Sequence, residues 1–251
     1  MSARLTLSRG HEDGGVRTAV EATYRKLHRD IIDGVYEPGT KLRIDHLKSG
    51  LQVSGSTIRE ALTKLISDQL VSVEQQKGFR VSPTSLQDLT DLTYARTILE
   101  CAAIRNSILH GDEEWEAQLV GIFHRLSRVE ERLADNHNVF DEWEQRNREF
   151  HEALVAGTNS QWLKRLWLIL FQQSERYRRL ASRNAKSRFD VHGEHRAIFD
   201  ATIARNADLA EALLQAHIRR AVEVLTQSGL FDSGTSPEFS KPKLQTSVSD
   251  R

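Results

Sequence analysis

The chain has 251 residues, 39% of them hydrophobic and 28% charged, which is typical of one large or two modest globular domains. Its longest apolar stretch, around residues 166–171, is far shorter than the roughly 18 residues that a membrane-spanning helix needs. The first residues contain no apolar run, so we expect no secretory signal. A single cysteine, Cys101, excludes an internal disulfide, and we expect a cytoplasmic protein in which this thiol is an ordinary buried side chain.

The 35 basic and 35 acidic residues cancel, but they are unevenly distributed. Residues 1–85 hold 13 Lys and Arg against 10 Asp and Glu, whereas residues 86–251 hold 22 against 25. This surplus is too small to indicate a nucleic-acid partner by itself. The partner has to be inferred from local motifs.

Residues 1–16 are polar and contain glycines, and we expect them to form a flexible tail. We expect residues 17–83 to fold as a first domain. Apolar residues at helical spacing predict a helix ending near Gly34, followed by a turn at EPGT, residues 37–40. A second, short helix is expected to end near Gly50.

The stretch SGSTIREAL, residues 54–62, predicts the start of a third helix. Within it, Thr57 and Glu60 match the S/T-x-x-E capping box. The runs LVSVE and FRVS then alternate as strands do, and a turn containing Lys77 and Gly78 joins them into a predicted hairpin. Helix, helix, turn, helix and hairpin is the layout of a winged helix-turn-helix.

In such a domain the N-terminal residues of one helix contact base edges in DNA. Arg59 lies in the first two turns of the third helix and can donate two hydrogen bonds to a phosphate or to guanine. The small hydroxyl residues Ser54, Ser56 and Thr57 allow close backbone approach. Taken by itself, this stretch favours an ordinary capped helix with solvated charges, and only the order of the surrounding elements reverses this in favour of DNA binding.

Three blocks, IIDGVYEPGTKL, VSGSTIREALTKLISDQLV and KGFRV, resemble in order and spacing the N-terminal domain of GntR-family bacterial transcription regulators. The resemblance covers most of residues 17–83. It implies that the residues matching Ser54, Ser56, Arg59, Lys77 and Gly78 contact operator DNA.

One position departs from the family pattern. Gly55 stands where the family commonly has arginine, which removes a phosphate anchor and a possible guanine reader. We therefore expect a shifted base preference, or compensation from Arg43, His46 or Lys77. The complete predicted DNA-binding set is Arg43, His46, Ser54, Gly55, Ser56, Thr57, Arg59, Lys77 and Gly78.

The second domain, expected over residues 84–228, contains no convincing strand. Amphipathic stretches predict helices over 85–110, 112–135, 138–157, 160–182, 188–205 and 208–228. The predicted fold class is therefore mainly α, with a winged helix-turn-helix whose wing is a small β-hairpin, followed by an all-α bundle of six or seven helices. Residues 229–251 are rich in Ser, Thr, Pro and Lys, and we expect them to be disordered.

Three of the ten histidines stand beside apolar positions in three different predicted helices: His151, His195 and His217. Asn147 precedes His151 by one helical turn, so both lie on one face. Three imidazoles with one oxygen ligand would suit Zn²⁺, Mn²⁺ or Ni²⁺ and leave room for an outside ligand. Alternatively, each histidine is an ordinary hydrogen-bonded core residue, since the sequence does not show that they converge.

The second domain resembles the FCD ligand-binding domain of the FadR subfamily. R-x-x-L-E at residues 96–100, N-x-x-F-H at 147–151, the Glu194–His195 pair and His217 carry this resemblance. It implies that Asn147 and the three histidines bind a divalent metal ion and that a carboxylate effector completes its coordination. Asn147 replaces the commoner aspartate, which should weaken metal retention but strengthen the attraction for an anion.

An anionic effector also needs hydrogen-bond donors. Arg96 matches a pocket position of the family, and Arg176, Tyr177 and Arg179 are further candidates, although they could equally form a solvated basic face. The segment DEWEQRNREFHEALVAG is similar to the matching segment of the CsiR-type subgroup. Members of this subgroup repress genes for the catabolism of glutarate and related amino-acid products. This resemblance implies a small dicarboxylate, glutarate first.

The predicted function is that of a homodimeric repressor that leaves a palindromic operator when a small carboxylate binds. A metal-dependent enzyme is the alternative, because three histidines with an open position also describe catalytic zinc. Against it, His151 and Glu152 lack the second histidine of H-E-x-x-H, and no glycine-rich phosphate loop is present.

Overall fold

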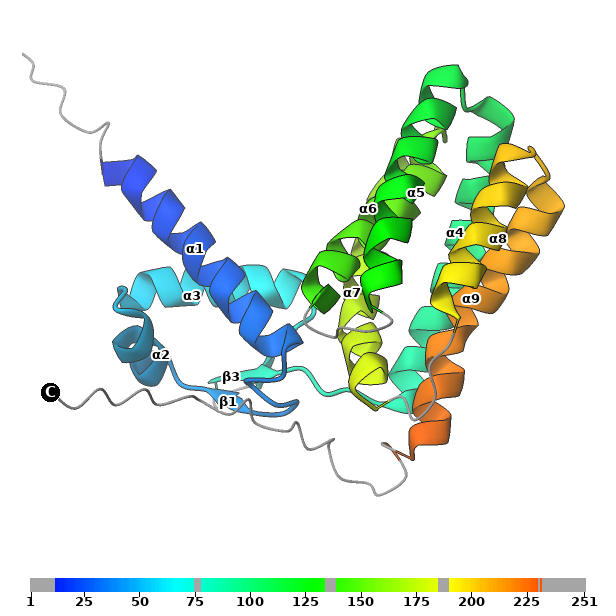
Figure 1. Cartoon of the computed structure of the whole chain (residues 1–251). Coiled ribbons are helices and arrows are strands. Elements are labelled where there is room, and N and C mark those ends of the chain that lie inside the picture. Colours follow the sequence, from blue (N-terminus) through cyan, green and yellow to red (C-terminus); the bar gives the residue numbers. More distant parts are fainter. Residues whose placement is uncertain (1–11, 75–77, 134–138, 185–189, 230, 232–251) are drawn as a thin grey trace, which may run out of the picture. The chain divides into compact units, whose positions relative to one another are not determined.

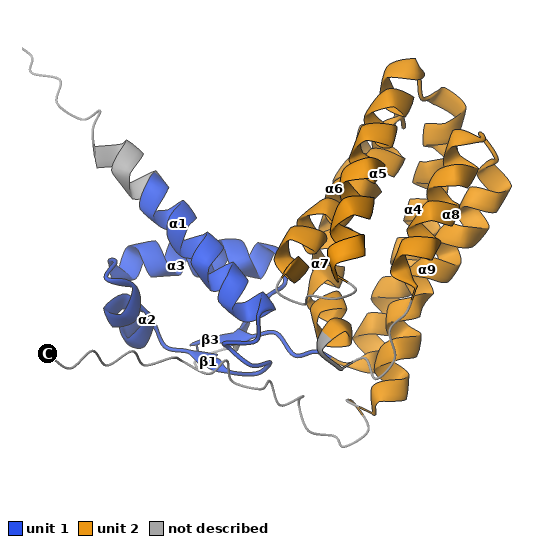
Figure 2. Cartoon of the chain, viewed as in Figure 1, with its two compact units in different colours: residues 1–84, 234–251 blue, residues 85–233 orange. Residues whose placement is uncertain are grey.

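The computed structural model describes residues 12–74, 78–133, 139–184, 190–229 and 231. The chain divides into two compact units, residues 1–84 with 234–251, and residues 85–233 (Figure 2). Each unit has its own hydrophobic core. Among the described helices, none combines the length and the apolar character that crossing a bilayer requires.

The described part of the first unit contains three helices and a three-stranded antiparallel sheet (Figure 1). The elements are α1 (Glu12–Ile32), β1 (Lys41–Leu42), α2 (Ile44–Leu51), α3 (Gly55–Ser67), β2 (Val71–Glu74) and β3 (Gly78–Val81). Strand β3 lies between the other two, with Arg80 opposite both Lys41 and Ser72. This confirms the winged helix-turn-helix.

One face of helix α3 packs on the apolar core of the first unit. Ile58, Leu62 and Leu65 are fully buried and pack against Leu27 and Ile31 of α1. Burying one face of α3 in this way leaves its opposite face in solvent, where it can meet a partner.

The structure corrects three details of this domain. Helix α1 begins at Glu12, inside the predicted tail 1–16. The sheet has a third strand, β1, because two residues are too few to show an alternating pattern. The N-cap of α3 is Ser54, whose hydroxyl accepts a hydrogen bond from Thr57 N at 3.1 Å, so the capping box predicted for Thr57 and Glu60 is wrong.

The second unit is an all-α bundle. Its described helices are α4 (Leu86–His110), α5 (Glu113–Leu133), α6 (Phe140–Ala156), α7 (Gln161–Asn184), α8 (Val191–Ile203) and α9 (Ala207–Ser228). All six predicted helices are confirmed. Residues 230 and 232–251 of the tail predicted at 229–251 lie outside the described residues.

Polar caps mark where these helices begin. The side chains of Ser85, Asp190 and Asn206 accept backbone hydrogen bonds at the starts of α4, α8 and α9. Inside the bundle, α4 packs along α9, α5 along α6, and α8 against α9. The fully buried Phe150 and Ile198 belong to the core that joins α6 to α8. This packing brings the inner faces of α6, α8 and α9 together.

Candidate functional sites

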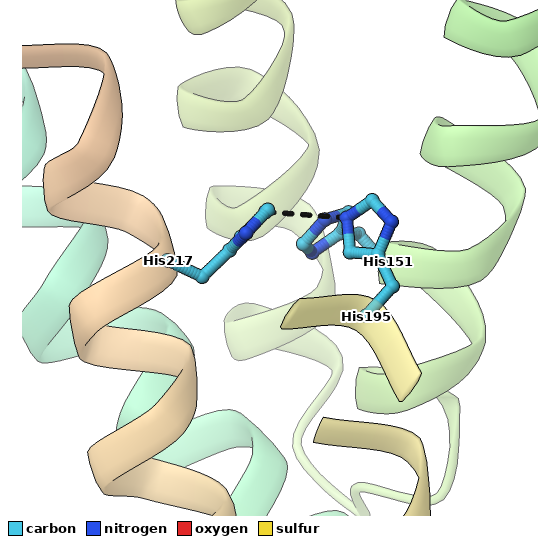
Figure 3. A group of neighbouring side chains, drawn as sticks. All are labelled: His151, His195 and His217. Atoms are coloured by element: carbon cyan, nitrogen blue, oxygen red, sulfur yellow. Dashed lines mark hydrogen bonds between the residues drawn. The ribbon is translucent and has the colours of Figure 1, made fainter. Parts of the chain in front are cut away.

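Three histidines from separate helices meet inside the second unit (Figure 3). His151 comes from α6, His195 from α8 and His217 from α9, and each offers a ring nitrogen within 4.8 Å of the others. His151 is 2% exposed and His195 is fully buried. The three predicted histidines therefore form one cluster, and this cluster could hold a metal ion.

Two of these histidines are oriented by glutamates. Nδ1 of His195 lies 2.6 Å from Oε1 of Glu130, and Nδ1 of His217 lies 2.8 Å from Oε2 of Glu194. Burial raises the pKa of each carboxyl group, but the histidines, together with Trp143 at Glu130 and Arg220 at Glu194, outweigh burial and leave both pKa values below their usual range. Because an ionised carboxylate only accepts hydrogen bonds, both Nδ1 atoms carry the ring proton.

This arrangement turns the other nitrogen of each ring toward its neighbour. Nε2 of His195 and Nε2 of His217 are 3.3 Å apart, and a ring that carries its single proton on Nδ1 cannot donate from Nε2. Burial lowers the pKa of His217 to about 4, despite its hydrogen bond to Glu194, so an extra proton is disfavoured. Two nitrogens that bind one tetrahedral Zn²⁺ at about 2.0–2.1 Å lie about 3.3–3.4 Å apart. The pair therefore fits a divalent cation.

His151 and Asn147 complete the candidate ligand set from α6. Both are 2% exposed, and among the described residues neither Nδ1 of His151 nor Oδ1 of Asn147 has a hydrogen-bond partner. Burial, reinforced by His217 and His195, holds the pKa of His151 well below its usual range, so the ring is neutral and able to bind a metal. An unpaired buried polar atom costs about 1–3 kcal/mol, which a bound ion would offset.

Arg96 is the one predicted effector residue that lies beside this cluster. It is 6% exposed, and its Nε donates to Oε1 of Glu100 at 2.7 Å. Its guanidinium carbon is 5.4 Å from the ring centroid of Phe171, which is itself 5.4 Å from the ring centroid of His151. A cation is therefore available next to the histidines.

The structure does not bring the predicted residues Tyr177 and Arg179 to the cluster. The Tyr177 hydroxyl donates to Asp88 at 2.5 Å, and Arg179 pairs with Asp141 at 2.8 Å and with Glu175 at 3.0 Å. Asp88 lies about 12 Å along α4 from Arg96, because a helix rises about 1.5 Å per residue. Asp141 lies about 15 Å along α6 from His151 by the same measure.

Arg176 lies next to Tyr177 on α7 and, like it, interacts with Asp88 at the start of α4. It is 5% exposed, and burial lowers its pKa to about 10, opposed by Tyr177 and Asp88. The residue of this segment that does approach the cluster is Arg178, which the sequence analysis did not select. It shares a helical face with Phe171 and Ser174, and this spacing was the signal that could have found it.

The predicted DNA-binding residues of α2 and α3 lie mostly on the surface. Arg43 and His46 at the start of α2 are exposed, as are Ser56 and Arg59 of α3. Ser54 is exposed too, and its hydroxyl lies 2.8 Å from that of Ser56. Helices α2 and α3, with the residues that cap them, therefore present hydroxyl, imidazole and guanidinium groups to solvent.

The remaining predicted DNA-binding residues differ in their surroundings. Gly55 is half-buried at the first turn of α3, and Gly78 is exposed with a φ of 86°, which favours glycine. Thr57 is only 6% exposed and its hydroxyl lies 2.8 Å from that of Ser54, so it supports the helix start and offers little surface to DNA. Lys77 lies outside the described residues.

Comparison with known proteins divides the chain in the same way. The family described as "Bacterial regulatory proteins, gntR family" matches residues 19–81. The family described as "FCD domain" matches residues 91–220, which include all three histidines and Arg96. The first match covers the winged helix-turn-helix, and the second covers most of the helical bundle.

Similar proteins extend over most of the chain. The uncharacterised HTH-type transcriptional regulator BphR of Paraburkholderia xenovorans is 45% identical over 86% of this chain and 88% of its own length. The HTH-type transcriptional repressor GlaR of Escherichia coli is 34% identical over 82% of this chain and 94% of its own length. A solved GntR-type regulator from Rhodococcus sp. RHA1 is 25% identical, with a TM-score of 0.66, over 83% of this chain and 98% of that one.

Proposed function

This chain belongs to the GntR family, in the FadR subfamily with an FCD domain, and on that basis we propose that it is a homodimeric repressor released from operator DNA by a small carboxylate. It is a ligand-responsive, DNA-binding transcriptional regulator. The similar proteins are transcriptional regulators and not enzymes, so the metal-dependent enzyme is set aside. The repressor role is supported by the 34% identity to the repressor GlaR.

DNA contact is assigned to the exposed surface of the winged helix-turn-helix. Arg59 is the main base reader, because its long, unburied side chain leaves the first turns of α3. Ser54, Ser56, Arg43 and His46 supply phosphate or sugar contacts around it. Gly55 and Gly78 belong to the proposed surface as well, and Lys77, outside the described residues, stays a predicted DNA contact. Two copies related by a two-fold axis would read the two halves of a palindrome.

The convergence of two buried histidines and a half-buried one beside Arg96 is the observation that carries the effector site. His151, His195 and His217, with Asn147, would hold a divalent ion such as Zn²⁺, Mn²⁺ or Ni²⁺. When bound, this ion supplies a Lewis-acidic charge for an anionic effector. All four proposed ligands are neutral, so the charge of the ion is undiminished.

The proposed effector is a small dicarboxylate, with glutarate as the first candidate. Arg96 offers a guanidinium for one carboxylate. The choice of glutarate is supported by the similarity to CsiR-type repressors noted in the sequence. Binding weakens the affinity for the operator only to the extent that the effector prefers the conformation unsuited to DNA, typically by about 1–3 kcal/mol.

A thermal-shift panel tests this function directly. Purified full-length protein would be heated with mono- and dicarboxylates of three to six carbons, with and without Zn²⁺, Mn²⁺ and Ni²⁺. An effector at about 100 times its Kd should stabilise the protein by about 2.7 kcal/mol. The variant His217→Ala should lose the metal-dependent part, whereas His124→Ala, at an exposed position on α5, should keep it. If no acid stabilises the wild type under any metal condition, the effector assignment is wrong.

A further inference from the structure

Arg178 of α7 is a half-buried cation close to the proposed effector site. Its side chain is 14% exposed. Its Nε donates to Oε1 of Glu144 at 3.0 Å, and its Nη2 bonds the same carboxylate. The other edge of the guanidinium meets a neutral partner, since Nη1 donates to the hydroxyl of Ser174. The carboxylate of Glu144 therefore binds one edge of the Arg178 guanidinium, and the Ser174 hydroxyl, a weaker acceptor, binds the other edge.

Phe171 connects this cation to Arg96 and to the histidines. The guanidinium carbon of Arg178 is 4.2 Å from the Phe171 ring centroid, and that of Arg96 is 5.4 Å from the same centroid. The sum of these two distances is an upper limit on the separation of the two cations. The Phe171 ring, which both guanidinium groups contact, lies 5.4 Å from the ring of His151 in the histidine cluster.

The residues around Arg178 share helical faces with the proposed metal ligands. On α6, Glu144 precedes Asn147 by three positions and His151 by seven, so all three lie on one face. On α7, Phe171 and Ser174 precede Arg178 by seven and four positions. The ion pair thus joins α6 to α7, on the face of α6 that also carries Asn147 and His151.

A further buried donor lies on this face of α7. Trp167 is 2% exposed and stacks on Phe171 with ring centroids 4.9 Å apart. Its Nε1–H has no hydrogen-bond partner among the residues that the structure describes. A buried indole N–H is usually paired, so an oxygen-rich ligand in this interface would satisfy it.

We propose that Arg178 binds the second carboxylate of a dicarboxylate effector, with Glu144 as the positioning residue. This inference rests on the proposed carboxylate-responsive function. Glu144 keeps the Nε edge of the guanidinium in place, and the effector oxygen replaces the Ser174 hydroxyl at Nη1. Exchanging a neutral acceptor for an ionised one strengthens that hydrogen bond, and the part-buried ion pair with Glu144 stays intact. A monocarboxylate can use only the Arg96 end, so Arg178 makes the site selective for dicarboxylates.

The test compares the Kd values of glutarate and butyrate, by calorimetry on full-length protein, in wild type and three variants. Wild type should prefer glutarate. Arg178→Gln should weaken glutarate binding about 10- to 100-fold and leave butyrate binding unchanged. Arg178→Lys keeps the charge but not the forked guanidinium, so its Kd for glutarate should lie between those of wild type and Arg178→Gln. Arg179→Gln is the matched control, because Arg179 is 13% exposed and also ion-paired, but to Asp141 and Glu175.

The outcomes separate this inference from the proposed function. If Arg178→Gln, or Arg178→Lys where the first variant does not fold, keeps the preference of the wild type for glutarate, Arg178 does not bind the effector. Equal Kd values for the two acids in wild type would overturn the inference as well. If wild type binds neither glutarate, nor butyrate, nor any other acid of the thermal-shift panel, the proposed function fails and this inference fails with it.

Discussion

Nε2 of His195 faces Nε2 of His217 at 3.3 Å, while the opposite nitrogen of each ring contacts a different glutamate. Each ring is thereby fixed in the tautomer that turns its lone pair toward the other. Carboxylates placed behind metal-binding histidines in this way orient the ligands and raise their basicity. The pair is thus prepared for a cation before any cation binds.

Removing one of these glutamates should weaken metal binding without removing a ligand. Glu130 accepts from His195 and, at 2.9 Å, from His192, and Trp143 Nε1 lies 3.3 Å from it. In Glu130→Gln we expect the Kd for Zn²⁺, measured by competition with a chelating dye, to rise about 10- to 100-fold. Glu131→Gln, one residue further at an exposed position, should bind Zn²⁺ as the wild type does. Equal affinities in the two variants would contradict the role of Glu130.

Restoring a negative ligand should have opposite effects on the metal and the effector. In Asn147→Asp a carboxylate replaces a buried amide whose Oδ1 has no partner among the described residues. We expect tighter retention of Zn²⁺ during dialysis against EDTA, and weaker glutarate binding to the metal-loaded protein, because the added charge partly cancels that of the ion. Parallel changes in both affinities would show that Asn147 does not contact the ion.

Arg59 should control operator affinity. Its exposed side chain on α3 is the proposed base reader, so Arg59→Ala should weaken binding to an operator selected from a random library by about 1–3 kcal/mol. The preference at one base position should relax at the same time. Arg128→Ala, an exposed change on α5, provides the control for general loss of charge. An unchanged Kd in Arg59→Ala would exclude this residue as a reader.

Position 55 should tolerate a side chain. A Cβ there would lie 3.8 Å from Cγ2 of Ile44 and 3.9 Å from Nη1 of Arg59, which are ordinary contact distances. Gly55→Ala should therefore raise the free energy of unfolding by about 0.4–1 kcal/mol in a urea titration. Gly55→Arg should fold and select a different operator from the same library. If Gly55→Arg selects the wild-type operator, position 55 does not contribute to base preference.

Cys101 should react slowly with thiol reagents at neutral pH. Burial, reinforced by Glu211 and Glu100, raises the pKa of its thiol to about 11. The reactive thiolate is therefore scarce at pH 8, and its fraction should grow as the pH rises toward 11. Alkylation by iodoacetamide, followed by mass spectrometry, should be slower than for the same thiol in urea at pH 8. Equal rates in the two conditions would contradict this prediction.

Periodicity in the sequence was sufficient for the longer helices, because a helix of 13 or more residues repeats its apolar face several times. Strand β1 has two residues and shows no such repeat, so it became visible only through its pairing with β3. A short motif was also too little to place the cap of α3. Thr57 matched the S/T-x-x-E pattern, although Ser54 occupies the cap position.

Family-like motifs in the sequence were enough to select the three histidines and Arg96, because each motif is local. Whether these residues meet depends on contacts between helices far apart in the chain, and the packing of α6, α8 and α9 brings the histidines together. Tertiary structure also decided which basic residue of SERYRRL faces the cluster. Adjacent positions on a helix point about 100° apart, so Tyr177 and Arg179 meet Asp88 and Asp141, while Arg178 meets Phe171.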